Sequence, residues 1–187
     1  MPASNPFESV LIAASQGAEW AWERLVGDLD GRLRSYVRRQ GGVDVDDLLG
    51  ETWLQVARGL HRFSGDEAAF RSWVFMIVHH RIVDERRRLR RKPAQSVDDA
   101  DLEEVAPQAR SAESEAIERI GDEELQRVLD TLPPDQREVV ILRFVACFGV
   151  TEIAQIVGKS PGAVRALQRR ALKRLEKILG KGGTFSP

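Results

Sequence analysis

A chain of 187 residues can form one ordinary domain or two small ones. With 42% hydrophobic and 30% charged residues, the composition predicts a soluble globular protein rich in charged helices. Membrane insertion is excluded because no apolar run approaches the roughly 18 residues of a membrane span. The first residues, MPASNPFESVL, lack the basic start and apolar middle of a secretory signal, so we expect a cytoplasmic protein. The single cysteine, Cys147, lies in the apolar run RFVACFGV, which predicts a buried, inert thiol.

The net charge of −1 hides a strong segregation of charge along the chain. Residues 79–92 contain seven Arg or Lys against two Asp or Glu, and residues 159–181 contain eight against one. Between these blocks, residues 95–130 contain three basic against twelve acidic side chains. A single charged run is usually a solvated helix face. Two basic blocks that each lie in a helical pattern favour contact with nucleic acid.

The hydrophobic pattern has neither a repeat nor strand-like alternation, so the predicted fold class is all-α. In chain order, the first helices are expected over residues 7–16, 18–39, 44–60 and 68–91. Gly17 separates the first two, and a break is expected within the second at Gly31. Asp44 is suited to cap the third helix, whose inward face carries Leu49, Trp53, Val56 and Leu60.

The second half of the chain predicts a separate unit. Pro93 ends the fourth helix, and residues 93–116 are acidic and short of large apolar side chains, which predicts a flexible linker. Order is expected to return over residues 117–180, followed by a disordered tail over residues 181–187. The chain is therefore expected to form two small helical domains, 1–92 and 117–180, joined by a tether.

The stretch GKSPGAVRALQRR has the features of a helix-turn-helix. Thr151 is suited to cap a short helix, Gly158 to form the turn, and Ser160 to cap the next helix ahead of Pro161. The second helix of such a unit enters the major groove, where arginine can bond guanine through two hydrogen bonds. Its outward face carries Arg165, Arg169 and Lys173. The alternative is an amphipathic helix with a solvated basic face.

Aromatic residues adjoin the first basic block, at Phe63, Phe70, Trp73 and Phe75. Aromatics beside cations suit single-stranded DNA, although taken alone these rings are more simply interpreted as core. His79, His80 and Asp84 resemble a metal-binding fragment, but no further ligand lies nearby and we expect no metal site. Neither a glycine-rich phosphate loop nor a nucleophile elbow is present, so we expect no cofactor and no enzymatic activity.

Four stretches, taken in order, resemble the sigma-70 superfamily of bacterial transcription initiation factors, specifically the extracytoplasmic-function (ECF) group. They are DVDDLLGETWLQVARGLHRF, FRSWVFMIVHHRIVDERRR, LPPDQREVVILRF and TEIAQIVGKSPGAVRALQRRALKRL. The ECF group keeps only the second and fourth sigma domains. The resemblance, which runs from about Gln16 to Leu179, therefore implies a sigma-2-like helical bundle over residues 1–92 and a sigma-4-like helix-turn-helix domain over residues 117–180.

The resemblance also implies which residues contact which partner. It implies that the chain docks on the β′ clamp helices of core RNA polymerase through Asp47, Leu48, Glu51 and Gln55. The β flap of the polymerase is a second implied partner of the chain. Melting and reading of the minus-ten element falls to Arg62, Phe63, Ser64, Arg71, Trp73, His79, His80 and Arg87. Reading of the duplex minus-thirty-five element falls to Ser160, Gly162, Arg165, Ala166, Arg169 and Lys173. Members of this family are commonly held inactive by an anti-sigma protein.

The function implied is that of a promoter-specificity subunit that binds core polymerase, recognises both promoter elements and promotes DNA opening. Three residues depart from the family's usual patterns, at Gly50, His80 and Gln168. We expect the first to alter a polymerase contact and the others to alter promoter preference. Two other functions stay open: a stand-alone helix-turn-helix regulator that binds a palindromic operator as a dimer, and a helical protein-interaction adaptor whose basic blocks are merely solvated.

Overall fold

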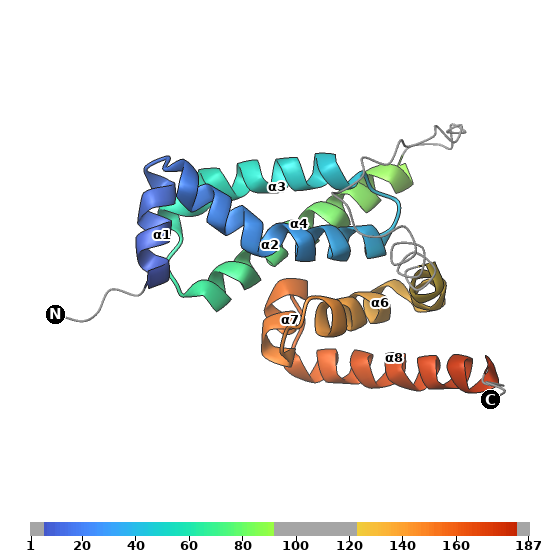
Figure 1. Cartoon of the computed structure of the whole chain (residues 1–187). Coiled ribbons are helices and arrows are strands. Elements are labelled where there is room, and N and C mark those ends of the chain that lie inside the picture. Colours follow the sequence, from blue (N-terminus) through green and yellow to red (C-terminus); the bar gives the residue numbers. More distant parts are fainter. Residues whose placement is uncertain (1–5, 92–122, 183–187) are drawn as a thin grey trace, which may run out of the picture.

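The computed structural model describes residues 6–91 and 123–182, in which short turns and loops join the helices and neither range contains a strand (Figure 1). The N-terminal half contains α1 (Pro6–Ser15), α2 (Glu19–Gln40), α3 (Val45–Gly59), the 3₁₀ turn η1 (Leu60–Arg62) and α4 (Glu67–Arg91). The C-terminal half contains a helical segment over residues 123–130, then α6 (Pro134–Val140), the π-helical turn η2 (Ile141–Val145), α7 (Val150–Val157) and α8 (Pro161–Gly182). The all-α prediction is confirmed. The predicted linker, residues 93–116, lies outside the described residues.

Local capping residues behave as the sequence predicts. The Asp44 carboxylate accepts the backbone N–H of Asp47 at 2.9 Å and so starts α3. Gly158 adopts the left-handed conformation, with φ 65°, at the turn between α7 and α8. The Ser160 hydroxyl then accepts the N–H of Ala163 at 3.2 Å. The predicted helix-turn-helix geometry is therefore present.

Two predicted helix limits were wrong. Helix α2 continues without a break through Gly31, because Leu29 and Leu33 on either side are both buried in the core and keep the helical stripe intact. Helix α7 starts at Val150 with Gly149 as its N-cap, not at Thr151. Here the Glu152 carboxylate accepts the Gly149 N–H at 2.7 Å and supplies the cap.

The prediction of a buried Cys147 was also wrong, because the thiol is exposed. The backbone N–H of Ala146 bonds to the carbonyl of Ile141 at 3.1 Å, which is the wide spacing of a π-helical turn. The extra residue in this turn shifts the side chains that follow relative to the core. Phe144 becomes 56% exposed, Cys147 takes a positive φ of 60°, and Phe148 is fully buried.

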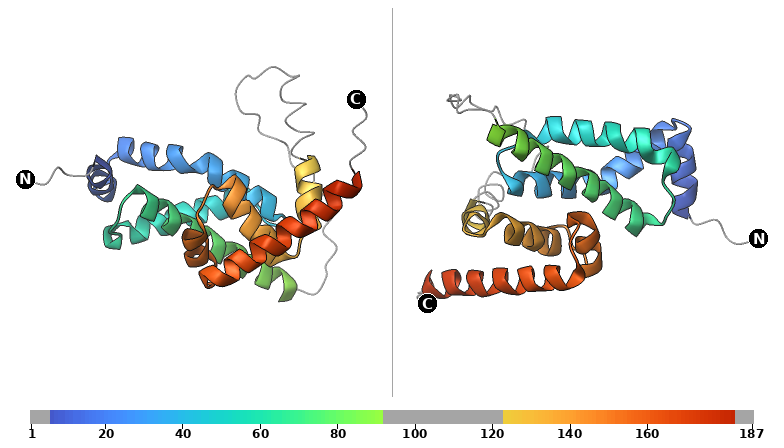
Figure 2. Two further views of the ribbon diagram at one scale, coloured as in Figure 1. Left: turned by 90° about the horizontal axis from the view of Figure 1, so that it is seen from below. Right: turned by 180° about the vertical axis from the view of Figure 1, so that it is seen from behind.

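One continuous core joins the two halves of the molecule. Helices α6 and α7 lie against α2 and α4, and α8 lies outside them (Figures 1 and 2). The rings of Phe75 on α4 and Phe148 meet edge to face, with centroids 4.8 Å apart. Helices α3 and α8 therefore occupy opposite sides of the molecule, with the shared core between them.

Candidate nucleic-acid interface

The outer face of α3 combines acidic, polar and apolar side chains. Asp47, Glu51 and Gln55 are exposed, and Leu54 beside them is 59% exposed. Arg81 of α4 donates to the carboxylate of Glu51 and to the side-chain oxygen of Gln55, so these two are held in place. Sequence reasoning missed Leu54, although its position seven residues after Asp47 puts it on the same helical face.

Leu48 and Gly50, on the same helix, differ in what they can contribute. Leu48 is buried, so its side chain packs in the core and does not face a partner. Gly50 is exposed, and a Cβ built there meets no atom within 4 Å. The departure at Gly50 thus leaves a bare patch of helix backbone on the outer face of α3.

The loop after η1 forms a hollow of about 390 Å³ against α1. Phe63 and Ser64 line it from the loop, and Leu11 and Ile12, which no sequence pattern connects with this loop, line it from α1. The ring of Phe63 also stacks on Trp73, with centroids 5.1 Å apart. Arg62, next to the hollow, is exposed. Aromatic surface, a hydroxyl and a cation therefore gather at one edge, which suits an unstacked base.

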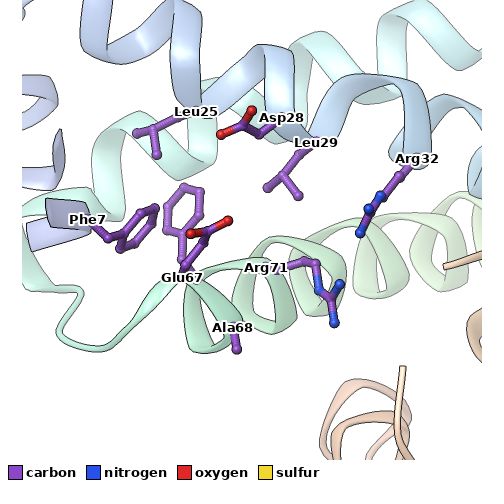
Figure 3. Close-up of a pocket in the computed structure, with 9 residues that line it drawn as sticks. Phe7, Leu25, Asp28, Leu29, Arg32, Glu67, Ala68 and Arg71 are labelled. Atoms are coloured by element: carbon purple, nitrogen blue, oxygen red, sulfur yellow. The ribbon is translucent and has the colours of Figure 1, made fainter. Parts of the chain in front are cut away.

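A second hollow, of about 500 Å³, lies between α1, α2 and α4 (Figure 3). Phe7, Leu25 and Leu29 give it apolar walls, and the carboxylates of Asp28 and Glu67 enter it from facing helices. Arg71 lines its edge, but its side chain extends toward the ribbon of the C-terminal helices. Arg71 is therefore the predicted DNA-binding residue that links this hollow to the second half of the molecule.

The guanidinium of Arg71 is occupied by the C-terminal half. Its carbon lies 4.5 Å from the ring centroid of Phe148, and its Nη2 lies 3.6 Å from Oε1 of Glu152. The hydroxyl of Ser72 lies 3.4 Å from the same Glu152 oxygen. Arg71 is consequently half-buried and faces α7 instead of solvent.

His79 is likewise turned toward the C-terminal half and only 8% exposed. Its Nδ1 lies 2.5 Å from Oε1 of Glu138, a buried carboxylate on α6. The hydroxyl of Tyr36 donates to the same oxygen at 2.7 Å. Burial, and next the charge of Glu138, raise the pKa of Tyr36 well above its ordinary value. His79 thus belongs to a buried polar cluster between the halves.

The remaining predicted minus-ten residues on α4 do not share this orientation. His80 and Arg87 are exposed, and Arg87 lies 3.5 Å from Asp84 within the same helix. The structure therefore divides the predicted set in two. Arg62, Phe63, Ser64 and Trp73 gather near the loop and His80 and Arg87 stay open, whereas Arg71 and His79 face the C-terminal half.

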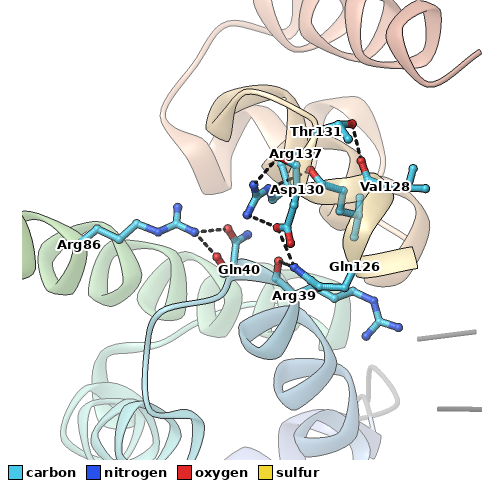
Figure 4. Close-up of polar contacts among 9 residues, drawn as sticks. Arg39, Gln40, Arg86, Gln126, Val128, Asp130, Thr131 and Arg137 are labelled. Carbon is cyan, nitrogen blue, oxygen red and sulfur yellow. Dashed lines mark hydrogen bonds and ion pairs between the residues drawn. The ribbon is translucent and has the colours of Figure 1, made fainter. Parts of the chain in front are cut away.

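A further polar cluster ties the end of α2 to its neighbours (Figure 4). Arg86 donates to both the backbone and side-chain oxygens of Gln40, at 2.7 and 2.8 Å. Gln126 donates to the backbone oxygen of Arg39 at 3.4 Å, which is the contact here that crosses between the halves. Gln126 also donates to Asp130 at 3.0 Å. The bonds of Arg86 to Gln40 and of Gln126 to Asp130 thus lie within one half and are short, whereas the bond of Gln126 to Arg39 joins the halves and is long.

The outer face of α8 is basic and open. Arg165, Arg169 and Lys173 are exposed, and within residues 6–91 and 123–182 no ion pair is made by any of the three. Ser160 and Gly162 lie exposed at the helix start, and Ala166 is half-buried. Gln168 and Leu172 line the same shallow groove as the two arginines, so Gln168 lies beside the basic face and not inside the core. This surface is mainly positive, with Gln168 and Leu172 between the cations and one exposed carboxylate, Glu176, at its far end.

The described ranges contain neither a metal-binding cluster nor a membrane-spanning helix. No three His, Cys, Asp or Glu side chains there are grouped so that they could hold a metal ion. None of the helices described is long and apolar enough to cross a lipid bilayer.

Comparison with known families matches both halves of the chain. Sigma-70 region 2 matches residues 22–92, and sigma-70 region 4 matches residues 122–175. The first match covers most of α2 together with α3 and α4, and the second covers the helix-turn-helix.

Individual relatives and a solved structure agree with these matches. The ECF RNA polymerase sigma factor SigD of Mycobacterium tuberculosis is 29% identical over 158 residues, which is 83% of this chain and 72% of SigD. The ECF RNA polymerase sigma factor ShbA of Streptomyces griseus is 32% identical over 135 residues, covering 72% of this chain and 71% of ShbA. A structure of sigma factor RpoE with the anti-sigma factor NepR from Bartonella quintana shares the fold, with TM-score 0.63 and 17% identity over 85% of this chain and 96% of RpoE.

The chain belongs to the ECF RNA polymerase sigma factors, and is thus a promoter-specificity subunit for transcription initiation.

Proposed function

We propose that the outer face of α3 is the surface that docks on core RNA polymerase. Asp47, Glu51 and Gln55 supply charge and hydrogen-bonding groups there, and Leu54 supplies an apolar anchor beside them. Protein interfaces commonly combine an exposed apolar side chain with neighbouring polar ones. Leu48 stabilises α3 from within.

DNA contacts fall to two separate surfaces. The hollow beside Phe63 and Ser64 receives an unstacked base of the minus-ten element, with Arg62 and the exposed His80 and Arg87 near the strand. Arg71 and His79 take part once they are freed from the C-terminal half. The basic face of α8 reads the minus-thirty-five duplex through Arg165 and Arg169, with Lys173 on phosphate.

The observation that carries the DNA-binding proposal is the open positive face of α8. Arg165 and Arg169 are exposed and make no ion pair among the described residues, although acidic side chains are abundant in the chain. A row of unpaired cations at the start of a recognition helix fits phosphate and base edges. Each of the two DNA contacts is small. Both gain from effective concentration once polymerase holds them on one promoter.

The domain limits proposed are a sigma-2-like domain over residues 1–92 and a sigma-4-like domain over residues 117–180. The protein acts in the cytoplasm as a binding subunit with no catalytic activity of its own. RpoE of Bartonella quintana was solved with an anti-sigma factor, and we propose a protein inhibitor of that kind for this chain.

The experiment that tests this function compares promoter DNA binding by the free chain and by the chain with core RNA polymerase. We expect weak binding of the free chain, and site-specific protection of both elements only when polymerase is added. Tight binding of the free chain to a palindromic site would instead establish the stand-alone regulator. Promoter protection that is unchanged in an Arg165→Glu/Arg169→Glu variant would favour the adaptor.

A further inference from the structure

The polar contacts between the two halves differ in length, and the short ones are made to one carboxylate. Glu138 of α6 is only 8% exposed, and its Oε1 receives the Tyr36 hydroxyl at 2.7 Å and faces His79 Nδ1 at 2.5 Å. The other polar contacts between the halves that involve Glu152 and Gln126 are 3.4–3.6 Å long. Hydrogen bonds weaken at such lengths. Glu138 is therefore the polar centre of this interface.

In the part of the chain that the structure describes, the Glu138 carboxylate exchanges water for two protein partners, Tyr36 and His79. A buried carboxylate is costly unless it is hydrogen-bonded and neutralised, and breaking a buried pair from one side leaves an uncompensated group. Opening the halves returns Glu138 to water and removes that cost. An interface centred on such a group is specific when closed, yet it gains hydration when it opens. The hydration that Glu138 gains therefore offsets part of the apolar contact that is lost when the halves separate.

The same contacts cover side chains for which we propose a role on DNA. His79 is buried beneath Glu138, and the Arg71 guanidinium is enclosed by Phe148 and Glu152. Carboxylates of the C-terminal half thus occupy positions on α4 where a phosphate would otherwise meet these groups. His79 cannot contact Glu138 in this buried site and a DNA strand at the same time.

We propose that Glu138 is a latch that holds the two halves closed and keeps Arg71 and His79 away from DNA. The latch opens when the halves separate, as they must for His79 to reach a DNA strand. The consequence for DNA rests on the function proposed above, whereas the latch itself is a property of the interface and can be measured without DNA.

The test measures the separation of the halves in the full-length chain by energy transfer between two dyes. The dyes are placed at Glu23→Cys on α2 and Lys177→Cys on α8, both exposed, in a Cys147→Ser background. Glu138→Ala removes the acceptor, and Tyr36→Phe removes one donor from the opposite half. Asp84→Ala is the matched control, because Asp84 is an exposed carboxylate paired with Arg87 within α4. Circular dichroism reports whether each variant keeps its helices.

We expect Glu138→Ala to lose energy transfer, with the ratio of open to closed chains raised about tenfold or more, since the Tyr36 hydroxyl and His79 would stay buried in the closed chain without their acceptor. Tyr36→Phe should shift the ratio in the same direction by less, and Asp84→Ala should leave it unchanged. Unchanged transfer in a folded Glu138→Ala variant would overturn the latch. If that variant fails to fold, unchanged transfer in Tyr36→Phe would overturn it.

A second readout separates this proposal from the proposed function. Binding of a fluorescent single-stranded oligothymidine to the same variants should tighten together with the loss of energy transfer. If the halves open but binding does not tighten, the latch stands and the assignment of Arg71 and His79 to DNA fails. If neither changes, the latch itself is wrong.

Discussion

Tyr36 shows at the scale of one residue how burial and charge act together. It is fully buried, and its hydroxyl donates to the carboxylate of Glu138 at 2.7 Å. Ionisation would place a phenolate beside a carboxylate in a dry site, so the pKa of Tyr36 is raised well above its ordinary value, first by burial and then by Glu138. Below that ordinary pKa of about 10, the stabilising effect of the neutral hydroxyl is fully present.

This environment predicts a loss of stability at alkaline pH. As the pH rises above about 10 toward the raised folded pKa, the unfolded chain releases the Tyr36 proton and the folded chain does not, so the free energy of unfolding falls. Tyr36 is the only tyrosine, and tyrosinate absorbance therefore reports it alone. We expect that absorbance to rise only as the helices are lost. Titration near pH 10 with intact helices would contradict the buried site, and Tyr36→Phe supplies the absorbance baseline.

Gly50 offers a test of local helix energetics. It lies inside α3 with open space around its Cβ position, so Gly50→Ala should raise the free energy of unfolding by about 0.5–1 kcal/mol through helix propensity. Gly158→Ala is the opposite control, because Gly158 has φ 65° and alanine there should destabilise. Urea unfolding measures both. A decrease for Gly50→Ala would show that the glycine serves the fold.

The sequence predicts the structural role of some single residues but not of others. Asp44, Gly158 and Ser160 act on their own backbone neighbours, and local rules were sufficient for each. Leu48 and His79 were assigned to partners by resemblance, yet their side chains are buried. Their burial depends on which helices pack against them, and that information is not local.

At the scale of the element, α8 combines a capped start, a buried stripe and an open basic face. Val164 and Ala171 are fully buried, whereas Arg165 and Arg169 are exposed on the outer side. Helical periodicity predicts both faces, which is why this element could be identified from the sequence alone. The π-helical turn before α7 could not, since no local pattern marks where a helix takes one extra residue.

Helix α8 also carries a prediction on DNA affinity. With core polymerase present, Arg165→Ala should weaken binding to a minus-thirty-five duplex by about 1–3 kcal/mol, as expected for loss of a two-bond contact to guanine. Arg174→Ala is the matched control, because Arg174 has the same charge and is exposed on α8, about two and a half turns after Arg165 and therefore on the opposite side of the helix. Filter binding or fluorescence anisotropy measures both. Equal losses for the two variants would mean that α8 contributes only general positive charge.

At the scale of the whole molecule, the two halves share one core and place α3 and α8 on opposite sides. The sequence predicts two helical units from its two patterned regions and the acidic stretch between them. It does not predict that Glu138 and Phe148 lie against α4, because contacts between distant segments leave no periodic signal. The sequence identified Asp47, Glu51 and Gln55 as candidates for polymerase docking, which stays a prediction, and it missed Leu54 although helical spacing puts that exposed residue on the same face.

We expect the outer face of α3 to bind core RNA polymerase. The most direct measurement is binding of labelled full-length chain to purified bacterial core polymerase, beside an Asp47→Lys/Glu51→Lys variant. A Glu19→Lys/Glu23→Lys variant is the control, because it reverses two exposed carboxylates at the same spacing on α2. We predict saturable sub-micromolar binding that the α3 variant loses and the α2 variant keeps. Equal binding by all three chains, or none where a known sigma factor binds, would contradict the account.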